Sequence, residues 1–229
     1  MDSRSIALDG PSGAGKSTLA RMASSRYGLI YVDTGAMYRC VGLHTLRNNV
    51  ASKDISGVTA LLPGIKLEML YDAAGVQRML LCGEDVTDFI RLPEVSGYAS
   101  DVSAMPQVRE FLLSLQRDMI VKYDVIMDGR DIGSVIMPGA GLKVFLTAEP
   151  EVRANRRFLE LLEKGSDVTY ENVLSDMIVR DKNDSERVEA PLRAAEDSVI
   201  LDTTTLSLNE SLQALCDLID KRFGYESKL

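Results

Sequence analysis

One nine-residue stretch, GPSGAGKST, constrains what this chain can fold into more than any other part of it. The stretch satisfies the pattern G-x-x-x-x-G-K-[ST] and begins directly after the apolar run SIALD. Glycines in this pattern let backbone N–H groups turn toward a phosphate, and the helix that follows adds the positive end of its dipole. A glycine-rich turn is often only a turn, but a full match between a predicted strand and a predicted helix favours a nucleoside triphosphate site.

The motif gives separate tasks to its side chains. Lys16 is expected to reach the β- and γ-phosphates, and the Ser17 hydroxyl is expected to bind Mg²⁺. The predicted ATP-binding loop consists of Gly10, Pro11, Ser12, Gly13, Ala14, Gly15, Lys16, Ser17 and Thr18.

Length and composition narrow the class of protein. A chain of 229 residues suits one α/β domain with insertions or two small domains, and its net charge of −8 argues against a partner that is a nucleic acid polymer. The sequence has no membrane-length apolar segment, and the first apolar run meets Asp9 too early for a signal peptide, so we expect a cytoplasmic protein. The widely spaced Cys40, Cys82 and Cys216 are expected to be reduced core thiols, and His44 is expected on a helix without a catalytic partner.

Short β-rich runs alternate with amphipathic helical patterns along the chain, which predicts an α/β fold with a parallel sheet flanked by helices. The predicted strands are SIALD (5–9), LIYVD (29–33), YDVIMD (123–128), LKVFLTA (142–148) and SVILDT (198–203). The predicted helices cover roughly residues 16–26, 35–47, 107–121, 150–164, 168–181 and 207–222.

The region from Lys66 to Val86 breaks this alternation. Apolar residues recur there at every second position, the turn sequence DAAG follows at 72–75, and a second apolar run comes next. This pattern predicts a β-hairpin. An antiparallel hairpin in a chain that otherwise alternates strands and helices indicates an inserted subdomain, which we place at about residues 50–95.

The use of the γ-phosphate separates the classes of nucleotide-binding protein. A GTPase switch should carry an N-K-x-D motif, but KND at 182–184 does not match it, and DAAG lies in the predicted hairpin turn. A mechanical ATPase is usually larger. Transfer of the γ-phosphoryl group to a small acceptor is therefore the favoured function, and a nucleotide-dependent binding protein without turnover is the alternative from another class.

Arginines that follow predicted strands indicate an anionic acceptor, because two phosphate groups brought close together need several converging positive charges. DTGAMYR supplies Arg39 after the second strand, and DGRD supplies Asp128, Arg130 and Asp131 at the carboxyl edge of the sheet. We also place Thr34 among the substrate-binding residues. Asp128 follows an apolar strand as a Walker-B-type magnesium ligand would, although a helix N-cap or a turn acid is the alternative.

A second charged insertion is expected at residues 150–187, with a helix stop at Lys164 and Gly165. The segment EVRANRRFLELLEKG within it carries Arg153, Arg156 and Arg157. Such a charge run alone is most often a solvated surface. In a kinase with a phosphate-binding loop, it can instead form a helical lid that excludes water and places positive charge near the transferring phosphoryl group.

The stretch RDKNDSER, residues 180–187, has no apolar side chain and follows an apolar-rich helical segment. Helical spacing puts Asp181 and Asp184 on the continuation of an apolar face, with Arg180 and Arg187 beside them. That face is formed by Val173, Leu174, Met177 and Ile178. Charges on the inward side of a helix must be paired or line a cavity, but Arg180 and Asp184 are also spaced for pairing with each other. The residues alone favour neither alternative, a charged cavity lining or pairing of the charges within the helix.

Together these motifs resemble bacterial cytidylate kinase, the (d)CMP kinase branch of the nucleoside monophosphate kinases. The resemblance runs through IALDGPSGAGKST, YVDTGAMYR, DGRDIG, RDKNDSERVEAPL and VILDTT, in that order. It implies phosphoryl transfer from ATP to CMP or dCMP with Mg²⁺, and we expect a monomer. Kinases acting on shikimate or UMP are the alternatives among enzymes.

The resemblance also implies roles for individual residues. Arg39 and Arg130 resemble ligands of the acceptor phosphate, and Arg180 with Asp184 resembles the pair that reads the pentose. The residues that resemble parts of the cytosine pocket are Ser100, Arg109 and Asp131, and Arg187 falls at a further nucleotide-contact position. Asn155 departs from a position that is often basic in relatives, so Arg153, Arg156 and Arg157 are assigned to catalysis, beside Lys16 and Arg130, only as a group.

Overall fold

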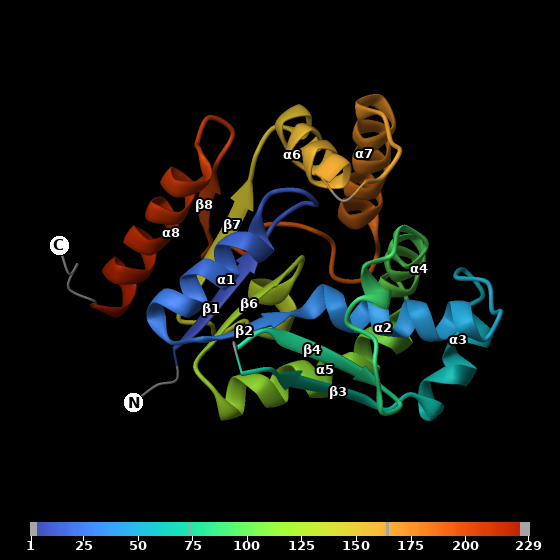
Figure 1. The fold of residues 1–229 in the computed structure, drawn as a ribbon. Helices are drawn as coiled ribbons and strands as arrows, with labels where there is room; N and C mark the ends of the chain where they lie inside the picture. Colours follow the sequence, from blue (N-terminus) through green and yellow to red (C-terminus); the bar gives the residue numbers. More distant parts are fainter. Residues whose placement is uncertain (1–3, 74, 164, 225–229) are drawn as a thin grey trace. The chain divides into compact units, whose positions relative to one another are not determined.

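The apolar runs of the sequence form a five-stranded sheet in the computed structural model, which describes residues 4–73, 75–163 and 165–224 (Figure 1). Its strands are β1 (Ser5–Asp9), β2 (Ile30–Asp33), β6 (Val125–Gly129), β7 (Leu142–Thr147) and β8 (Val199–Asp202). Their order across the sheet is β2-β6-β1-β7-β8. β1 pairs in parallel with β6 and β7, and β7 pairs in parallel with β8. The predicted α/β class with a parallel sheet is confirmed.

The chain divides into two compact units, one comprising residues 1–31 and 123–229 and the other residues 32–122. The first unit carries the helices α1 (Lys16–Tyr27), α6 (Pro150–Glu163), α7 (Tyr170–Glu186) and α8 (Leu208–Phe223). It also carries η3 (Ile132–Ile136), a short π-helical turn after β6.

The core of the first unit lies between the sheet and the helices α1 and α8, which pack against each other (Figure 1). β1 and β6 are buried along their whole length, as expected for central strands of a parallel sheet with both faces covered. A separate small cluster of Ala154, Val173 and Met177 holds α6 against α7.

The second unit contains α2 (Thr34–Arg47), α3 (Ile55–Leu61), α4 (Pro93–Ser103) and α5 (Pro106–Lys122), with the short 3₁₀ turns η1 (Leu62–Gly64) and η2 (Phe89–Arg91). α2 packs closely on α4 at Gly42. A Cβ atom at this position would lie only 2.9 Å from the Ala99 backbone nitrogen, which is too close for a side chain. A glycine at this position therefore brings the two backbones together.

A three-stranded antiparallel sheet completes the second unit: β3 (Leu67–Tyr71), β4 (Gln77–Leu81) and β5 (Glu84–Asp85). β3 and β4 form the hairpin predicted from the alternating pattern, and Leu67 lies opposite Leu81. Ala74 of the predicted DAAG turn lies outside the described residues. The proposed inserted subdomain, residues 50–95, falls inside this unit, whose bounds are wider.

Several local predictions can now be compared with the structure. α6 ends at Glu163 and Gly165 has a φ of +74°, while Lys164 of the predicted helix stop lies outside the described residues. Cys40 and Cys216 are buried, but the prediction of a core thiol was wrong for Cys82, which is exposed just after β4. Among the described residues, no helix is long and apolar enough to cross a membrane.

Candidate active site

The glycine-rich loop connects β1 to α1, as its sequence predicted, and α1 begins at Lys16. Gly10 has a φ of +150°, and a Cβ atom there would lie 2.0 Å from the Leu146 carbonyl oxygen on β7. Only glycine can therefore take the chain this close to the neighbouring strand. Gly13 and Gly15 also have positive φ values, which turns the loop backbone in the way a phosphate cradle needs.

Lys16 is buried, and its Nζ donates to the Pro11 carbonyl oxygen at 2.7 Å. Burial and the charge of Arg130 lower the pKa of Lys16, Asp128 and Asp9 oppose the shift, and the resulting pKa is about 7. A phosphate beside the amine would favour its charged form. The charge of Lys16 is thus sensitive to the charges placed beside it.

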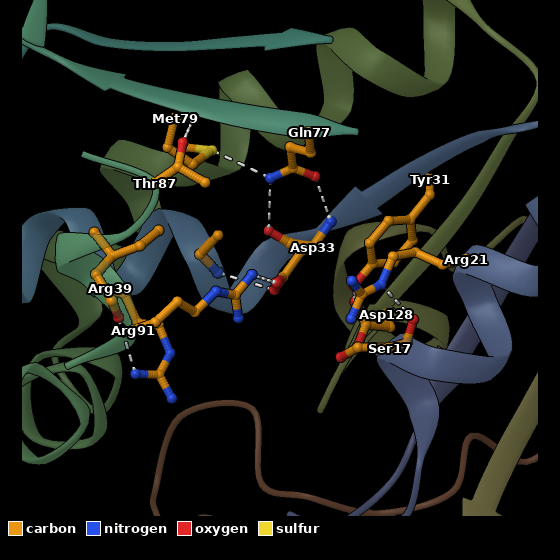
Figure 2. Close-up of polar contacts among 12 residues, drawn as sticks. Ser17, Arg21, Tyr31, Asp33, Arg39, Gln77, Met79, Thr87, Arg91 and Asp128 are labelled. Carbon is orange, nitrogen blue, oxygen red and sulfur yellow. Dashed lines mark hydrogen bonds and ion pairs between the residues drawn. The ribbon is translucent and has the colours of Figure 1, made fainter. Parts of the chain in front are cut away.

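Ser17 and Asp128 come together at the start of α1 and the end of β6 (Figure 2). The Ser17 hydroxyl donates to Asp128 Oδ2 at 2.8 Å, and the Tyr31 hydroxyl donates to Asp128 Oδ1 at 3.0 Å. Arg21 lies over the Tyr31 ring, with its guanidinium carbon 6.0 Å from the ring centroid. Asp128 is a buried strand residue, so the alternative that it is a helix N-cap or turn acid is wrong.

Arg130 and Asp184 form a buried ion pair, with Arg130 Nε 2.8 Å from Asp184 Oδ2. Burial tends to raise the pKa of Asp184, but the positive charges of Arg130, Arg180 and Arg187 outweigh it, so the pKa is lowered. The Asp184 backbone carbonyl accepts from the Leu192 N–H at 2.7 Å, which ties the end of α7 to the segment that follows it.

This geometry decides part of the question raised by RDKNDSER. Asp184 shares the buried face of α7 with Val173 and Met177, as predicted, but Ile178 is 51% exposed and does not belong to that face. The ion pair of Asp184 with Arg130 crosses to another element and is not a pairing within the helix. Asp184 therefore faces inward, whereas Lys182 and Glu186 on the same helix are exposed.

Arg187 and Asp131 approach each other close to this ion pair. Arg187 follows the last residue of α7, and its Nη2 lies 3.7 Å from Asp131 Oδ1. Arg187 Nε donates to the Ala190 carbonyl oxygen at 2.6 Å. The first unit thus brings together the predicted residues Arg130, Asp131, Asp184 and Arg187, each at most partly exposed.

Arg153 on α6 is buried and forms a hydrogen bond with the phosphate-binding loop. Its Nε donates to the Ala148 carbonyl oxygen at 2.7 Å, and its Nη1 donates to the Ser12 carbonyl oxygen at 2.9 Å. The same Nη1 lies 2.6 Å from Asp181 Oδ2 on α7. The alternative of a solvated charge run is therefore wrong for Arg153, which links α6 and α7 to the loop.

Arg156 and Arg157 lie elsewhere on α6. Arg156 donates to the carbonyl oxygens of Thr203 and Leu206 and to the Thr203 hydroxyl, at distances of 2.7 to 3.4 Å. Arg157 forms an ion pair with Glu160 on its own helix. The three arginines that were predicted to act as a group therefore make three separate sets of contacts.

The second unit carries Thr34, Arg39, Ser100 and Arg109, and the remaining predicted substrate residue, Arg180, lies on α7 in the first unit. Thr34 is buried at the first position of α2, where the Asp33 carboxylate accepts from the Ala36 N–H at 3.0 Å and caps the helix. Arg39 donates to the Ile90 carbonyl oxygen at 3.1 Å and to the Ser96 hydroxyl at 2.8 Å. These contacts fix the guanidinium of Arg39 beside η2 and α4.

Ser100 and Arg109 are joined through Ser103. Arg109 Nη1 donates to the Ser103 carbonyl oxygen at 3.2 Å, and the Ser103 hydroxyl donates to the Ser100 carbonyl oxygen at 2.8 Å. The Arg109 guanidinium carbon also lies 5.7 Å from the centroid of the Tyr38 ring, a cation–π arrangement that orients its planar group. The structure thus places these two residues together, on α4 and α5.

Figure 2 also shows a network around Asp33 that sequence reasoning missed. Arg91 Nη2 lies 2.7 Å from Asp33 Oδ2. Gln77 of β4 accepts from the Asp33 N–H at 2.8 Å and donates to its carbonyl oxygen at 3.4 Å. Asp33 therefore caps α2, pairs with Arg91 and is held by the hairpin. Residues so far apart along the chain leave no local pattern that could have revealed the network.

Comparison with known proteins identifies the family of this chain. A family model described as cytidylate kinase matches residues 6–221. A protein named cytidylate kinase from Caldicellulosiruptor saccharolyticus is 48% identical to this chain, and the alignment covers 99% of this chain and 100% of the relative. A protein of the same name from Caldicellulosiruptor bescii is 50% identical, over 96% of this chain and 97% of the relative. A third, from Carboxydothermus hydrogenoformans, is 46% identical over 95% of this chain and 97% of its own.

Among solved structures, an uncharacterized protein from Eubacterium ventriosum aligns with a TM-score of 0.53 at 10% identity, covering 96% of this chain and 99% of that one. At this identity the likeness supports the fold alone. The family model and the relatives over nearly the full length decide the family, and the phosphate-binding loop with its buried lysine is consistent with them. The chain belongs to the cytidylate kinase family.

Proposed function

We propose that this protein transfers the γ-phosphoryl group of ATP to CMP or dCMP, giving ADP and CDP or dCDP. The observation that carries the proposal is the position of the Arg130–Asp184 ion pair. It lies in the same unit as the phosphate-binding loop, and Arg130 is one of the charges that shift the pKa of Lys16. Family membership supports the nucleotide substrates.

The donor is proposed to bind along the loop from Gly10 to Thr18, with Lys16 against its terminal phosphates. The oxygens of Ser17 and Asp128, joined at 2.8 Å, are the hard ligands that Mg²⁺ prefers, so these two residues would hold it. Mg²⁺ bound there would neutralise phosphate charge. Tyr31 holds the second oxygen of Asp128, and thereby fixes the direction of the carboxylate.

The residues proposed for the acceptor are those that the family resemblance indicates. Arg39 and Arg130 suit the acceptor phosphate, because guanidinium groups make paired hydrogen bonds with phosphate oxygens. Asp184 can accept from a sugar hydroxyl, and Arg180 is proposed to act with it. The residues proposed for the base and for further contacts are Ser100, Arg109, Asp131, Arg187 and Thr34.

The lid, residues 150–187, is proposed to close over the donor, and residues 50–95 are proposed to bind the monophosphate. Arg153 already joins the Ser12 carbonyl to Asp181, so movement of α6 and α7 would be transmitted to the loop. Arg156 and Arg157 are proposed to lend positive charge after lid movement. We name no general base, because positioning and charge neutralisation suffice for this reaction. We further propose that the protein acts as a monomer.

The test is an enzyme-linked assay of ADP release with purified protein, ATP, Mg²⁺ and one acceptor at a time. We expect CMP and dCMP to be turned over far faster than UMP, AMP, GMP or shikimate. Turnover of UMP well above CMP would overturn the substrate assignment. Tight nucleotide binding without CDP formation would instead support the alternative function, a nucleotide-dependent binding protein without turnover.

A further inference from the structure

Asp9 ends β1 directly before the phosphate-binding loop, and its side chain reaches the segment that follows β6. Its Oδ1 accepts from the Ile132 N–H at 2.7 Å, and its Oδ2 accepts from the Gly133 N–H at 2.7 Å. Only 3% of Asp9 is exposed. A buried carboxylate thus uses both oxygens on two successive backbone amides.

These two amides are the first of η3, where N–H groups have no carbonyl partner within the turn. The preceding residue, Asp131, is the usual place for a capping side chain. Asp131 makes no capping hydrogen bond, and its Oδ1 lies 3.7 Å from Arg187 Nη2. Asp9 therefore caps this turn from a different strand, while the Asp131 carboxylate faces Arg187.

Asp9 also holds the other end of the same segment. Its backbone lies opposite Gly129 in the β1–β6 ladder. Arg130 and Asp131 are the two residues between Gly129 and Ile132, so the pair begins beside the Asp9 backbone in the ladder and ends at an amide bonded to the Asp9 carboxylate. A short segment held at both ends has little freedom to shift its side chains.

The fit between Asp9 and the capped turn depends on a glycine. A Cβ atom at Gly133 would lie 3.3 Å from Asp9 Oδ2 and 3.1 Å from Lys143 Cδ, so the glycine lets the carboxylate approach its amide. Burial and the charge of Asp131 raise the pKa of Asp9, the two amide hydrogen bonds and Lys16 lower it, and the resulting pKa is about 6. At neutral pH the carboxylate is charged and can accept from both amides.

We propose that Asp9 is a positioning residue that fixes Arg130 and Asp131, and through them the acceptor nucleotide, relative to the phosphate-binding loop. This inference rests on the function proposed above. It assigns to the residue before the loop a task on the acceptor side of the reaction, in addition to its place in the sheet.

The test is Asp9→Asn, which keeps the shape of the side chain but sets its NH₂ group against one of the two amide N–H groups. Steady-state rates are measured with CMP varied at saturating ATP, and then with ATP varied at saturating CMP. We expect the KM for CMP to rise roughly tenfold or more, as one buried hydrogen bond is lost, and the KM for ATP to change far less. Because misplaced reacting groups also slow the chemical step, kcat should fall.

A second variant keeps the inference testable if Asp9→Asn folds poorly. Gly133→Ala leaves the charge of Asp9 in place but pushes the amide away from Oδ2. It should reproduce the selective rise of the KM for CMP. In the double variant, Asp9→Asn with Gly133→Ala, the fold-increase in this KM should be smaller than the product of the two single fold-increases. Ile219→Val, in the buried core on α8, is the matched control for general destabilisation and should leave both KM values unchanged.

The outcomes distinguish this inference from the proposed function. If the wild-type protein does not phosphorylate CMP, the proposed function fails. If the wild type does phosphorylate CMP but Asp9→Asn and Gly133→Ala change the KM values for ATP and CMP equally, or change neither, the positioning role of Asp9 is overturned.

Discussion

Arg130, the residue after β6, donates from Nε to Asp184 Oδ2 on α7 at 2.8 Å, with both side chains largely buried. The contact joins residues 54 positions apart along the chain. Because Asp184 is also surrounded by the charges of Arg180 and Arg187, its carboxylate stays ionised despite burial. A charged carboxylate among arginines is suited to accept from a hydroxyl group and to hold Arg130 in one orientation.

Asp184→Ala should weaken the binding of CMP more than the binding of ATP. The variant leaves Arg130 buried without its carboxylate partner, which costs about 3–5 kcal/mol of folding stability for a buried pair. We therefore expect a lower Tm together with a KM for CMP that rises at least roughly tenfold. Steady-state kinetics with each nucleotide varied in turn measures the difference. Glu186→Gln, an exposed change on the same helix, is the control. If Asp184→Ala raises the KM values for both nucleotides equally, Asp184 has only a structural role.

Local sequence patterns were enough to predict the sheet strands and the phosphate-binding loop, because these depend on neighbouring residues. α4, Pro93–Ser103, was missed because its sequence PEVSGYASDVS contains glycine and three serines, which are weak helix formers. Tertiary contact with α2 holds it in helical form. The short α3 was missed as well, since seven residues give little periodic signal.

The candidate site was only partly predictable for a different reason. Helical spacing placed Asp184 on an inward face, but spacing cannot say which charge it meets across the fold. The partner Arg130 and the capping role of Asp9 depend on the strand order, in which β6 lies beside β1. Arg153 looked like part of a charged surface, whereas the structure buries it against the Ser12 carbonyl.

Lys16→Met should abolish most turnover and leave the fold in place. Methionine fills a similar volume without a buried charge, so we expect little change in Tm or circular dichroism. Loss of a positive group placed at developing phosphate charge should reduce kcat by roughly 10²-fold or more. Near-normal activity of the folded variant would contradict the assignment of this loop to the donor phosphates.

Asp9 should make the folding stability depend on pH between about 4 and 6. Its pKa is raised from 3.8 to about 6 in the folded state, so the folded protein binds a proton that the unfolded chain has already released in this range. The contribution of Asp9 to stability is therefore highest below pH 4 and falls as the pH rises to about 6. The shift corresponds to a loss on the order of 3 kcal/mol.

Asp9→Asn isolates this contribution from that of Asp184, whose lowered pKa gives the opposite dependence on pH. Urea unfolding of both proteins at pH 4, 5, 6 and 7 gives the difference in the free energy of unfolding. We expect the variant to be least stable relative to wild type at pH 4 and to recover as the pH rises. A difference that stays constant from pH 4 to 7 would show that the carboxylate does not titrate in this range.

Tyr31→Phe should weaken the binding of Mg²⁺ without disturbing the sheet. The variant keeps the ring beneath Arg21 but removes the hydroxyl that donates to Asp128 Oδ1 at 3.0 Å. Groups that orient a metal-binding carboxylate typically change metal affinity about 10- to 100-fold when they are lost. We therefore expect a higher Mg²⁺ concentration at half-maximal rate, and weaker Mn²⁺ binding with ADP in electron paramagnetic resonance titrations. Tyr27→Phe, which removes a hydroxyl bonded to Asp220, is the matched control, and equal metal affinity in the two variants would rule out this role for Tyr31.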